Sequence, residues 1–107
     1  MIELPYPPSK LNPNRKGHWA IKARATKEYR RECGWAAKFH PPMKRFMVKF
    51  HPPDKRPRDV DNVIAACKSL VDGLQDAWHI NDRDFEIIWP TKFSEPVKNG
   101  KIVVEGI

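Results

Sequence analysis

Two aspartates, Asp59 and Asp61, stand two residues apart and directly follow the basic run at 55–58, Lys-Arg-Pro-Arg. Side chains alternate in extended backbone, so both carboxylates are expected to point in the same direction. Like charges this close resist joint ionisation unless a cation lies between them. Mg²⁺ suits such a pair, because it takes one or two carboxylates and completes its shell with water and phosphate oxygens. The spacing therefore favours metal-assisted chemistry on a phosphate ester.

The same segment, residues 59–62, also matches the start of a helix. The sequence Asp-Val-Asp-Asn is typical of a capping segment, in which acidic side chains are favoured by the positive end of the helix dipole. Asp82 and Asp84, further along the chain, are either a third source of metal ligands or an acidic loop. The pattern of residues leaves both questions open.

Basic and acidic residues are distributed unevenly along the chain. The net charge is +7, but between Lys10 and Arg58 there are 15 Lys or Arg against 3 Asp or Glu. A basic half of this kind predicts a polyanionic partner, because each phosphate contact releases counterions. Seven acids then crowd into the 28 residues from Asp59 to Glu86. Carboxylates repel phosphate unless a divalent cation lies between them, which is the arrangement that a metal-dependent nuclease requires.

The elements that must position these groups follow from prolines, glycines and hydrophobic periodicity. In chain order, the expected elements are strand 1–6, helix 21–39, strand 43–51, helix 61–78, strand 85–89 and strand 101–105. The order β-α-β-α-β-β predicts a small α+β (mixed α/β) fold, with helices packed on a mixed sheet. At 107 residues, the chain is expected to be a single domain over residues 1–107.

The second predicted helix carries the clearest pattern. With Asp61-Asn62 as N-cap, apolar residues follow at spacings of three and four. At about 100° per residue, Lys68 and Asp72 each fall within about 20° of Asp61 on the helical wheel. These three polar side chains are therefore expected on one face of the helix, beside its apolar stripe.

Other kinds of chemistry are not favoured. Cys33 and Cys67 match no zinc or redox spacing, and Cys67 lies on the apolar side of the second helix, as a reduced core thiol would. The four histidines are scattered, and no Ser-His-Asp or Cys-His arrangement stands out. No stretch approaches the ~20 apolar residues of a membrane span, and the N-terminus lacks the apolar run of a signal peptide. We therefore expect a cytoplasmic protein without a membrane partner or an organic cofactor.

Five short segments of the sequence resemble motifs of the RusA family of Holliday junction resolvases. Residues 4–9, Leu-Pro-Tyr-Pro-Pro-Ser, are similar to that family's opening motif, and residues 29–30, Tyr-Arg, to a pair in its first helix. Residues 58–62, Arg-Asp-Val-Asp-Asn, resemble its Arg-Asp-x-Asp-Asn signature. Residues 68–74 resemble its Lys-x-x-x-Asp-Ala/Gly-Leu motif, and residues 81–82 fall where an acidic pair precedes the next strand. No single piece is specific, but five pieces in one order are.

The resemblance implies a Mg²⁺-dependent endodeoxyribonuclease, with Mn²⁺ as an alternative ion, that resolves four-way DNA as a two-fold homodimer. It also implies that Asp59, Asp61 and Asp82 bind the metal and that Lys68 is the essential lysine. The sequence departs from the family pattern at two points. Lys68 matches only if the helix contains three extra residues, which turn it by about 60° around the axis. Asparagine occupies the first position of the acidic pair, and Asp84 lies close enough to substitute.

We expect the basic loops to hold the DNA backbone. Lys55, Arg56 and Arg58 would supply one set of phosphate contacts. Arg15 and Lys16 would supply a weaker set, because their loop is longer and less anchored. Branched DNA is therefore the expected partner.

Two other functions fit the same residues. A non-catalytic DNA-binding module would use the basic loops for phosphate contacts and the aspartates only as helix caps. A nuclease with broader substrates would cut flaps, replication forks or RNA, because phosphate contacts carry no sequence information. If the chain pairs as a closed two-fold dimer, we expect the interface at the aromatic strand around Phe46 and Phe50 or at the strand that contains Trp89.

Overall fold

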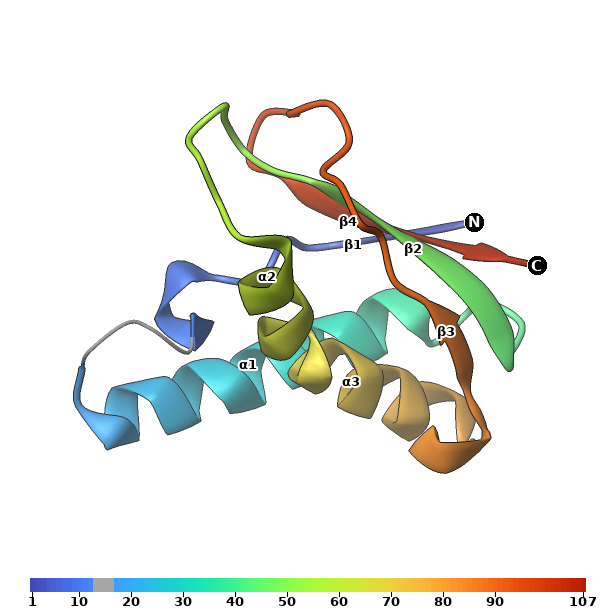
Figure 1. Cartoon of the computed structure of the whole chain (residues 1–107). Helices are drawn as coiled ribbons and strands as arrows, with labels where there is room; N and C mark the ends of the chain where they lie inside the picture. The colour runs from blue at the N-terminus through green and yellow to red at the C-terminus, as the bar shows by residue number, and fades with distance from the viewer. Residues whose placement is uncertain (13–16) are drawn as a thin grey trace.

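The computed structural model describes residues 1–12 and 17–107, and within them the chain folds into two layers (Figure 1). One layer is a sheet of four strands, β1 (Ile2–Leu4), β2 (Arg45–His51), β3 (Glu86–Ile88) and β4 (Lys101–Gly106). The other layer covers one face of the sheet with the helices α1 (Trp19–Ala37), α2 (Val60–Ala66) and α3 (Lys68–Trp78). Two 3₁₀ turns, η1 (Ser9–Leu11) and η2 (Asp82–Asp84), lie in the connections. The predicted α+β fold is confirmed.

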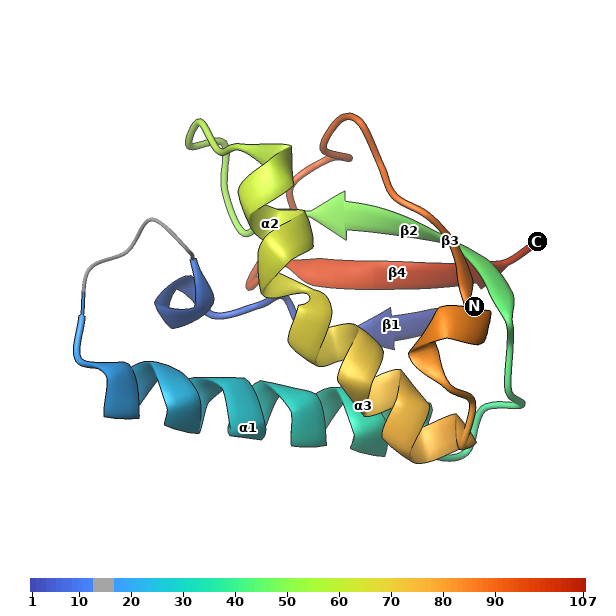
Figure 2. The ribbon, with the colours of Figure 1, turned by 60° about the horizontal axis from the view of Figure 1, so that its bottom comes forward.

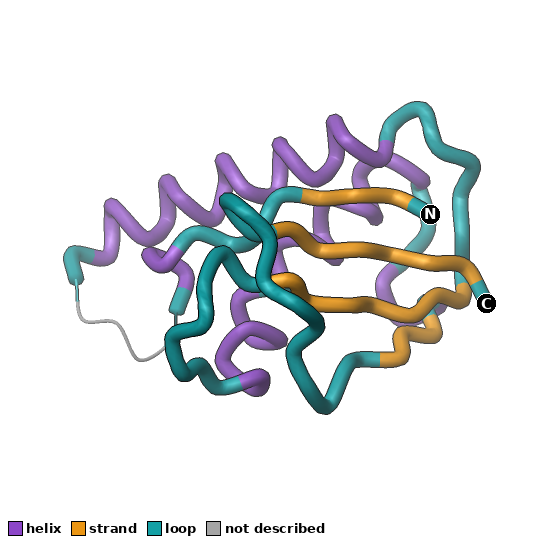
Figure 3. Tube along the Cα trace, turned by 90° about the horizontal axis from the view of Figure 1, so that it is seen from above, coloured by secondary structure: helices purple, strands orange, loops and turns teal. Residues whose placement is uncertain are grey.

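The sheet is mixed, as predicted, with the strand order β1-β4-β2-β3 (Figure 3). β4 pairs antiparallel with both β1 and β2, so that Val104 lies between Ile2 and Val48. β3 pairs parallel with β2, and Phe46 faces Ile87 across that pair. Because β2 and β3 run in the same direction, the chain leaves both strands toward the same end of the sheet. The loop that leads from β2 to Asp59 and Asp61 begins at this end.

The core lies between the sheet and the helices. Alternation along β2 turns Phe46, Val48 and Phe50 toward the helices, where they are 0%, 1% and 0% exposed. The expected dimer interface at Phe46 and Phe50 is therefore wrong, because both rings are buried in the core of the subunit. On the opposite face, ion pairs join neighbouring strands, including Lys101 with Glu3 at 3.0 Å.

The two long helices pack with their backbones close together. A Cβ atom on Gly73 of α3 would lie 2.5 Å from the carbonyl oxygen of Arg30 on α1, so this position requires glycine. The indole Nε1 of Trp78 donates to the carbonyl oxygens of Ala37 and His40, both at 3.1 Å. The Ala37 carbonyl oxygen also accepts the N–H of His40 at 3.0 Å, so Trp78 ties the end of α3 to the turn that ends α1.

The predicted helix 61–78 is two helices that meet at Cys67. The backbone of Cys67 has φ −77° and ψ 1°, well away from the helical ψ of about −42°. Its N–H is shared between the carbonyl oxygens of Val63 and Ile64, which tightens this turn. The wheel that placed Lys68 and Asp72 on the face of Asp61 assumed one straight helix, and that assumption is wrong.

Both cysteines are buried in the core as free thiols, at 0% exposure. Burial raises the pKa of Cys33 to about 12 and also raises the pKa of Cys67. Neutral, inaccessible thiols are poor nucleophiles and poor metal ligands. In the described part of the chain, no helix is both long enough and apolar enough to cross a membrane.

Candidate functional site

Asp59 caps α2. Its backbone is extended, with φ −97° and ψ 121°, and its Oδ1 accepts a hydrogen bond from the N–H of Asp61 at 2.9 Å. The helix therefore begins one residue before Asp61, and the predicted cap at Asp61-Asn62 is wrong because Asp59 takes that role. A carboxylate offers about four lone-pair sites, so one accepted hydrogen bond leaves Asp59 able to bind a cation as well.

Asp59 and Asp61 are exposed and line one open groove, called here the acid groove. Its other wall is Trp89, Pro90 and Thr91, which follow β3. The parallel pairing of β2 with β3 brings this segment beside the start of α2, and the Trp89 ring packs against Phe50 at 6.3 Å. No sequence pattern indicated this wall, because parallel pairing depends on contacts between distant segments.

A second hollow lies on the other side of Asp59 and is called here the motif hollow. Tyr6, Pro8 and Ser9 line it from the N-terminal segment, and Asp59 and Asn62 line it from the start of α2. Two segments that are some fifty residues apart in the chain therefore meet around Asp59. Asp59 belongs to both hollows. Similarity to the family motif was the sequence signal for both segments, but it could not place them in contact.

Tyr29 holds the N-terminal segment in place. Its ring is 2% exposed, and its hydroxyl donates to the carbonyl oxygen of Pro5 at 2.7 Å. Burial raises the pKa of Tyr29, so the phenol stays neutral and keeps its proton for this bond. Tyr29 thus positions the residues that line the motif hollow.

Tyr6 places a neutral hydroxyl next to the motif hollow. Burial raises the pKa of Tyr6, although the Arg58 guanidinium opposes this shift. The hydroxyl is buried and meets no hydrogen-bond partner within residues 1–12 and 17–107. A buried polar group of this kind is uncommon in native structures and is most stable when a ligand or water pairs with it.

The basic loop before α2 is organised by Asp54. Its Oδ1 accepts the N–H of Arg56 at 2.9 Å and pairs with Nη2 of Arg58 at 2.8 Å. The Arg56 N–H, together with the Arg58 guanidinium, holds the pKa of Asp54 below its usual value. The Arg58 side chain is 21% exposed, whereas that of Arg56 is 84% exposed and Lys55 lies on the surface. Arg58 therefore braces the loop, and the expectation that Lys55, Arg56 and Arg58 bind phosphate stays a prediction.

The other predicted site residues lie away from the acid groove. Lys68 is exposed at the start of α3, about 10 Å along the helices from Asp61 at 1.5 Å per residue. Asp82 lies in η2, beyond the far end of α3 (Figure 2). The helical path from Asp61 to Trp78 alone is about 25 Å long. The expectation that Asp82 joins Asp59 and Asp61 is therefore not met within one chain.

Within residues 1–12 and 17–107, no group of three or more His, Cys, Asp or Glu side chains is placed to hold a metal ion. Asp59 and Asp61 remain as a pair of exposed carboxylates that share one groove. Mg²⁺ is commonly held by one or two carboxylates, so the pair is chemically sufficient for it. Arg15 and Lys16, predicted to contact DNA, lie outside the described residues.

One comparison relates the chain to a bacterial protein. It is 32% identical over 112 residues to an uncharacterized protein of Xylella fastidiosa (strain Temecula1 / ATCC 700964), an alignment that spans 96% of this chain and 72% of that protein. The chain belongs to the same family as that protein. No family model matches the chain. The description of that protein assigns it no activity.

Proposed function

We propose that the chain is a Mg²⁺-dependent endodeoxyribonuclease of the RusA type that resolves four-way DNA junctions in the cytoplasm. One observation carries the proposal: two of the segments that carry the resemblance, 4–9 and 58–62, contribute residues to the same hollow and meet at Asp59. A helix cap requires only Asp59 and α2, so it does not explain why the N-terminal segment lies beside Asp59. A binding site shared by the two segments explains it.

Asp59 and Asp61 are the residues that would hold the metal. Both are exposed, and the cap fixes Asp59 relative to the backbone of Asp61. Their hard oxygen donors fit Mg²⁺, with Mn²⁺ as an alternative. When bound, such an ion lowers the pKa of a water molecule and neutralises charge that develops on the phosphate.

The chain itself supplies the grip on the DNA backbone. Lys55 and Arg56 project from the loop beside the acids, and Asp54 and Arg58 keep that loop folded. Phosphate contacts fix the register of the duplex on the protein, so they decide which phosphodiester bond lies over Asp59. We propose that Lys68, at the start of α3, contacts a neighbouring phosphate rather than the one that is cut.

A homodimer accounts for the remote position of Asp82. Resolution requires two matched cuts, and a closed two-fold pair supplies two equivalent sites. In such a pair, the η2 end of one subunit can approach the α2 end of the other. We therefore propose that Asp82 of the partner subunit completes each site, together with Asp59 and Asp61.

A second candidate function is a non-catalytic DNA-binding module. It is favoured by the cap at Asp59, which gives that residue a structural role without any metal. Such a module would bind DNA equally well in Mg²⁺ and in EDTA, and it would leave every strand intact.

The deciding experiment offers the purified chain a labelled four-way junction, a flap and a linear duplex of matching sequence. We expect symmetric paired cuts in the junction with Mg²⁺, little cutting of the duplex, and none of either in EDTA. Equal cutting of flap and junction would support the nuclease with broader substrates. Binding without cutting in any metal would support the binding module.

A further inference from the structure

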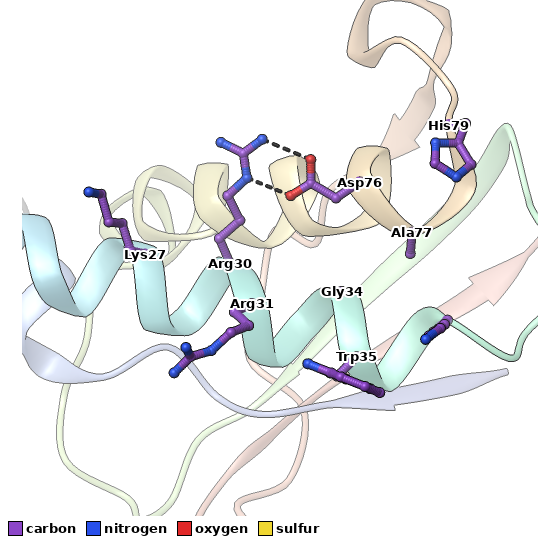
Figure 4. Close-up of a pocket in the computed structure, with 9 residues that line it drawn as sticks. Lys27, Arg30, Arg31, Gly34, Trp35, Asp76, Ala77 and His79 are labelled. Atoms are coloured by element: carbon purple, nitrogen blue, oxygen red, sulfur yellow. Dashed lines mark hydrogen bonds and ion pairs between the residues drawn. The ribbon is translucent and has the colours of Figure 1, made fainter.

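A further hollow, of a different character, lies between α1 and α3, far from the acid groove. It has a volume of about 390 Å³ and lies along the second half of α1 and the end of α3 (Figure 4). We call it the basic-aromatic groove; the residues used below are Lys27, Arg30, Arg31, Trp35, Lys38 and Asp76. None of them entered the candidate site above.

The charge of this groove is positive and not balanced by its own acid. Asp76 already has a partner, because Arg30 donates to its two oxygens at 2.7 and 2.8 Å (Figure 4). In the described part of the chain, no carboxylate forms an ion pair with Lys27, Arg31 or Lys38. Three cations are therefore available to an anionic ligand.

The acids of α1 do not reduce this charge from within the groove. Glu28 and Glu32 line a separate hollow, together with Tyr6 and Lys10. Basic side chains of α1 thus line the basic-aromatic groove, and neither of these two acids does. A hollow lined by basic side chains is typical of a surface that contacts a phosphate backbone.

The groove also presents an aromatic surface that the fold leaves open. The Trp35 side chain is 61% exposed and Phe39 nearby is 86% exposed. The Lys38 ammonium lies 4.6 Å from the centre of the Trp35 ring, within cation–π range. Burial of apolar area in the core does not explain a tryptophan held here. Cations beside an exposed aromatic ring form the usual platform for unpaired bases, which stack on the ring while the phosphates meet the charges.

We propose that the basic-aromatic groove binds an unpaired DNA strand, with one base stacked on Trp35 and its neighbouring phosphates on Lys27, Arg31 and Lys38. The choice of DNA rests on the proposed function, but the binding itself needs no metal and no cleavage. From Asp61, α2 and then α3 lead to Asp76 in the groove. Bases that open at a branch point would enter the groove away from the bond that is cut.

The test measures binding of the full chain to labelled oligo(dT) and to a duplex of equal length, in EDTA, by fluorescence anisotropy. Trp35→Leu keeps apolar area but removes the stacking ring, and should weaken oligo(dT) binding about 5- to 150-fold. Trp35→Phe should retain most of the affinity, and Trp35→Leu should change duplex binding far less. Lys98→Gln, on the exposed turn before β4, is the matched control for charge.

Charge is tested in the same assay. Replacing Lys27 and Arg31 together by Gln should lower the salt slope for oligo(dT) by about 1.4, at about 0.7 per phosphate on a single strand. Unchanged oligo(dT) affinity in Trp35→Leu would overturn the proposal. A second result would also overturn it: if the wild type is a dimer without nucleic acid and the Trp35→Leu variant is a monomer, the groove is a contact between two copies. EDTA prevents cutting, so a negative result in this binding assay does not bear on the proposed cleavage. Absence of cleavage, in turn, does not bear on strand binding by the basic-aromatic groove.

Discussion

The side chain of Asp59 accepts a hydrogen bond from the backbone N–H of Asp61 at 2.9 Å, so one carboxylate of the acid groove fixes the backbone of the other. This relationship gives Asp59 two roles that ordinary truncation would confuse. It caps α2, and it faces the groove that we assign to the metal. Asparagine separates the two roles, because it caps a helix about as well as aspartate but carries no charge.

We predict that Asp59→Asn abolishes cleavage while leaving the free energy of unfolding nearly unchanged. Asp59→Ala should abolish cleavage and also cost about 1 kcal/mol of stability through the lost cap. Urea unfolding of both variants, beside junction cleavage, measures the two effects. Normal cleavage by Asp59→Asn would leave Asp59 with the cap as its only role.

The assignment of Asp82 to the partner's site predicts complementation. Asp61→Asn and Asp82→Asn should each be inactive alone, yet a refolded mixture should nick junctions. In the mixed dimer, one site collects both defects and the other is intact, so only one strand is cut. If all three acids acted within one chain, each site of the mixed dimer would hold one defect and the mixture would stay inactive. Sedimentation of the wild type establishes that the dimer is present.

The folding of the basic loop predicts how each cation contributes to affinity. Replacing Lys55 and Arg56 by Gln should lower the salt slope for duplex binding by about 1.8, at about 0.9 per phosphate. Adding Arg58→Gln should lower the slope little further, because this guanidinium is occupied by Asp54. A further drop as large as that from each of the first two would mean that Arg58 leaves Asp54 to bind DNA.

The ion pair between Arg30 and Asp76 predicts a pH dependence of stability. The Arg30 hydrogen bonds lower the pKa of Asp76 below its ordinary value of 3.8. Stability from this pair is therefore complete above about pH 4 and is lost as the pH falls through the lower, folded-state pKa. Both side chains are about half exposed, so solvent screening limits the effect to a few tenths up to about 1 kcal/mol. Asp76→Asn should unfold at lower urea than wild type at neutral pH, with the gap closing in acid; a constant gap would contradict this.

The layout of the fold follows from local patterns, and the site only partly does. Alternation along β2 and the proline stops define the strands. Asn99 and Gly100, both at positive φ, then form the turn before β4. The break at Cys67 was not predictable from periodicity, because the apolar spacing continues unchanged through it. The parallel pairing of β3, which brings Trp89 beside the acids, depends on contacts between distant residues.

Long-range placement also explains why Asp82 does not join Asp59 and Asp61 within one chain. The resemblance implied that the three acids act together, but α2 and α3 lie between Asp61 and Asp82. Motif similarity identifies residue types that act together without stating whether they act within one chain. The basic-aromatic groove went unnoticed for a related reason. Its cations and Trp35 look like an ordinary helix surface until α3 is packed beside them.

The most direct test of the central proposal compares wild type with Asp61→Asn on the same labelled four-way junction. Junction affinity is measured in EDTA by gel retardation, and cutting is then started with Mg²⁺. Asp61→Asn keeps the cap, because Asp59 bonds to the backbone N–H of residue 61 and not to its side chain. We predict equal affinity, paired symmetric cuts by the wild type and no cuts by the variant. Cleavage by Asp61→Asn at the wild-type rate, or none by the wild type in Mg²⁺ or Mn²⁺, would contradict a metal nuclease built on this groove.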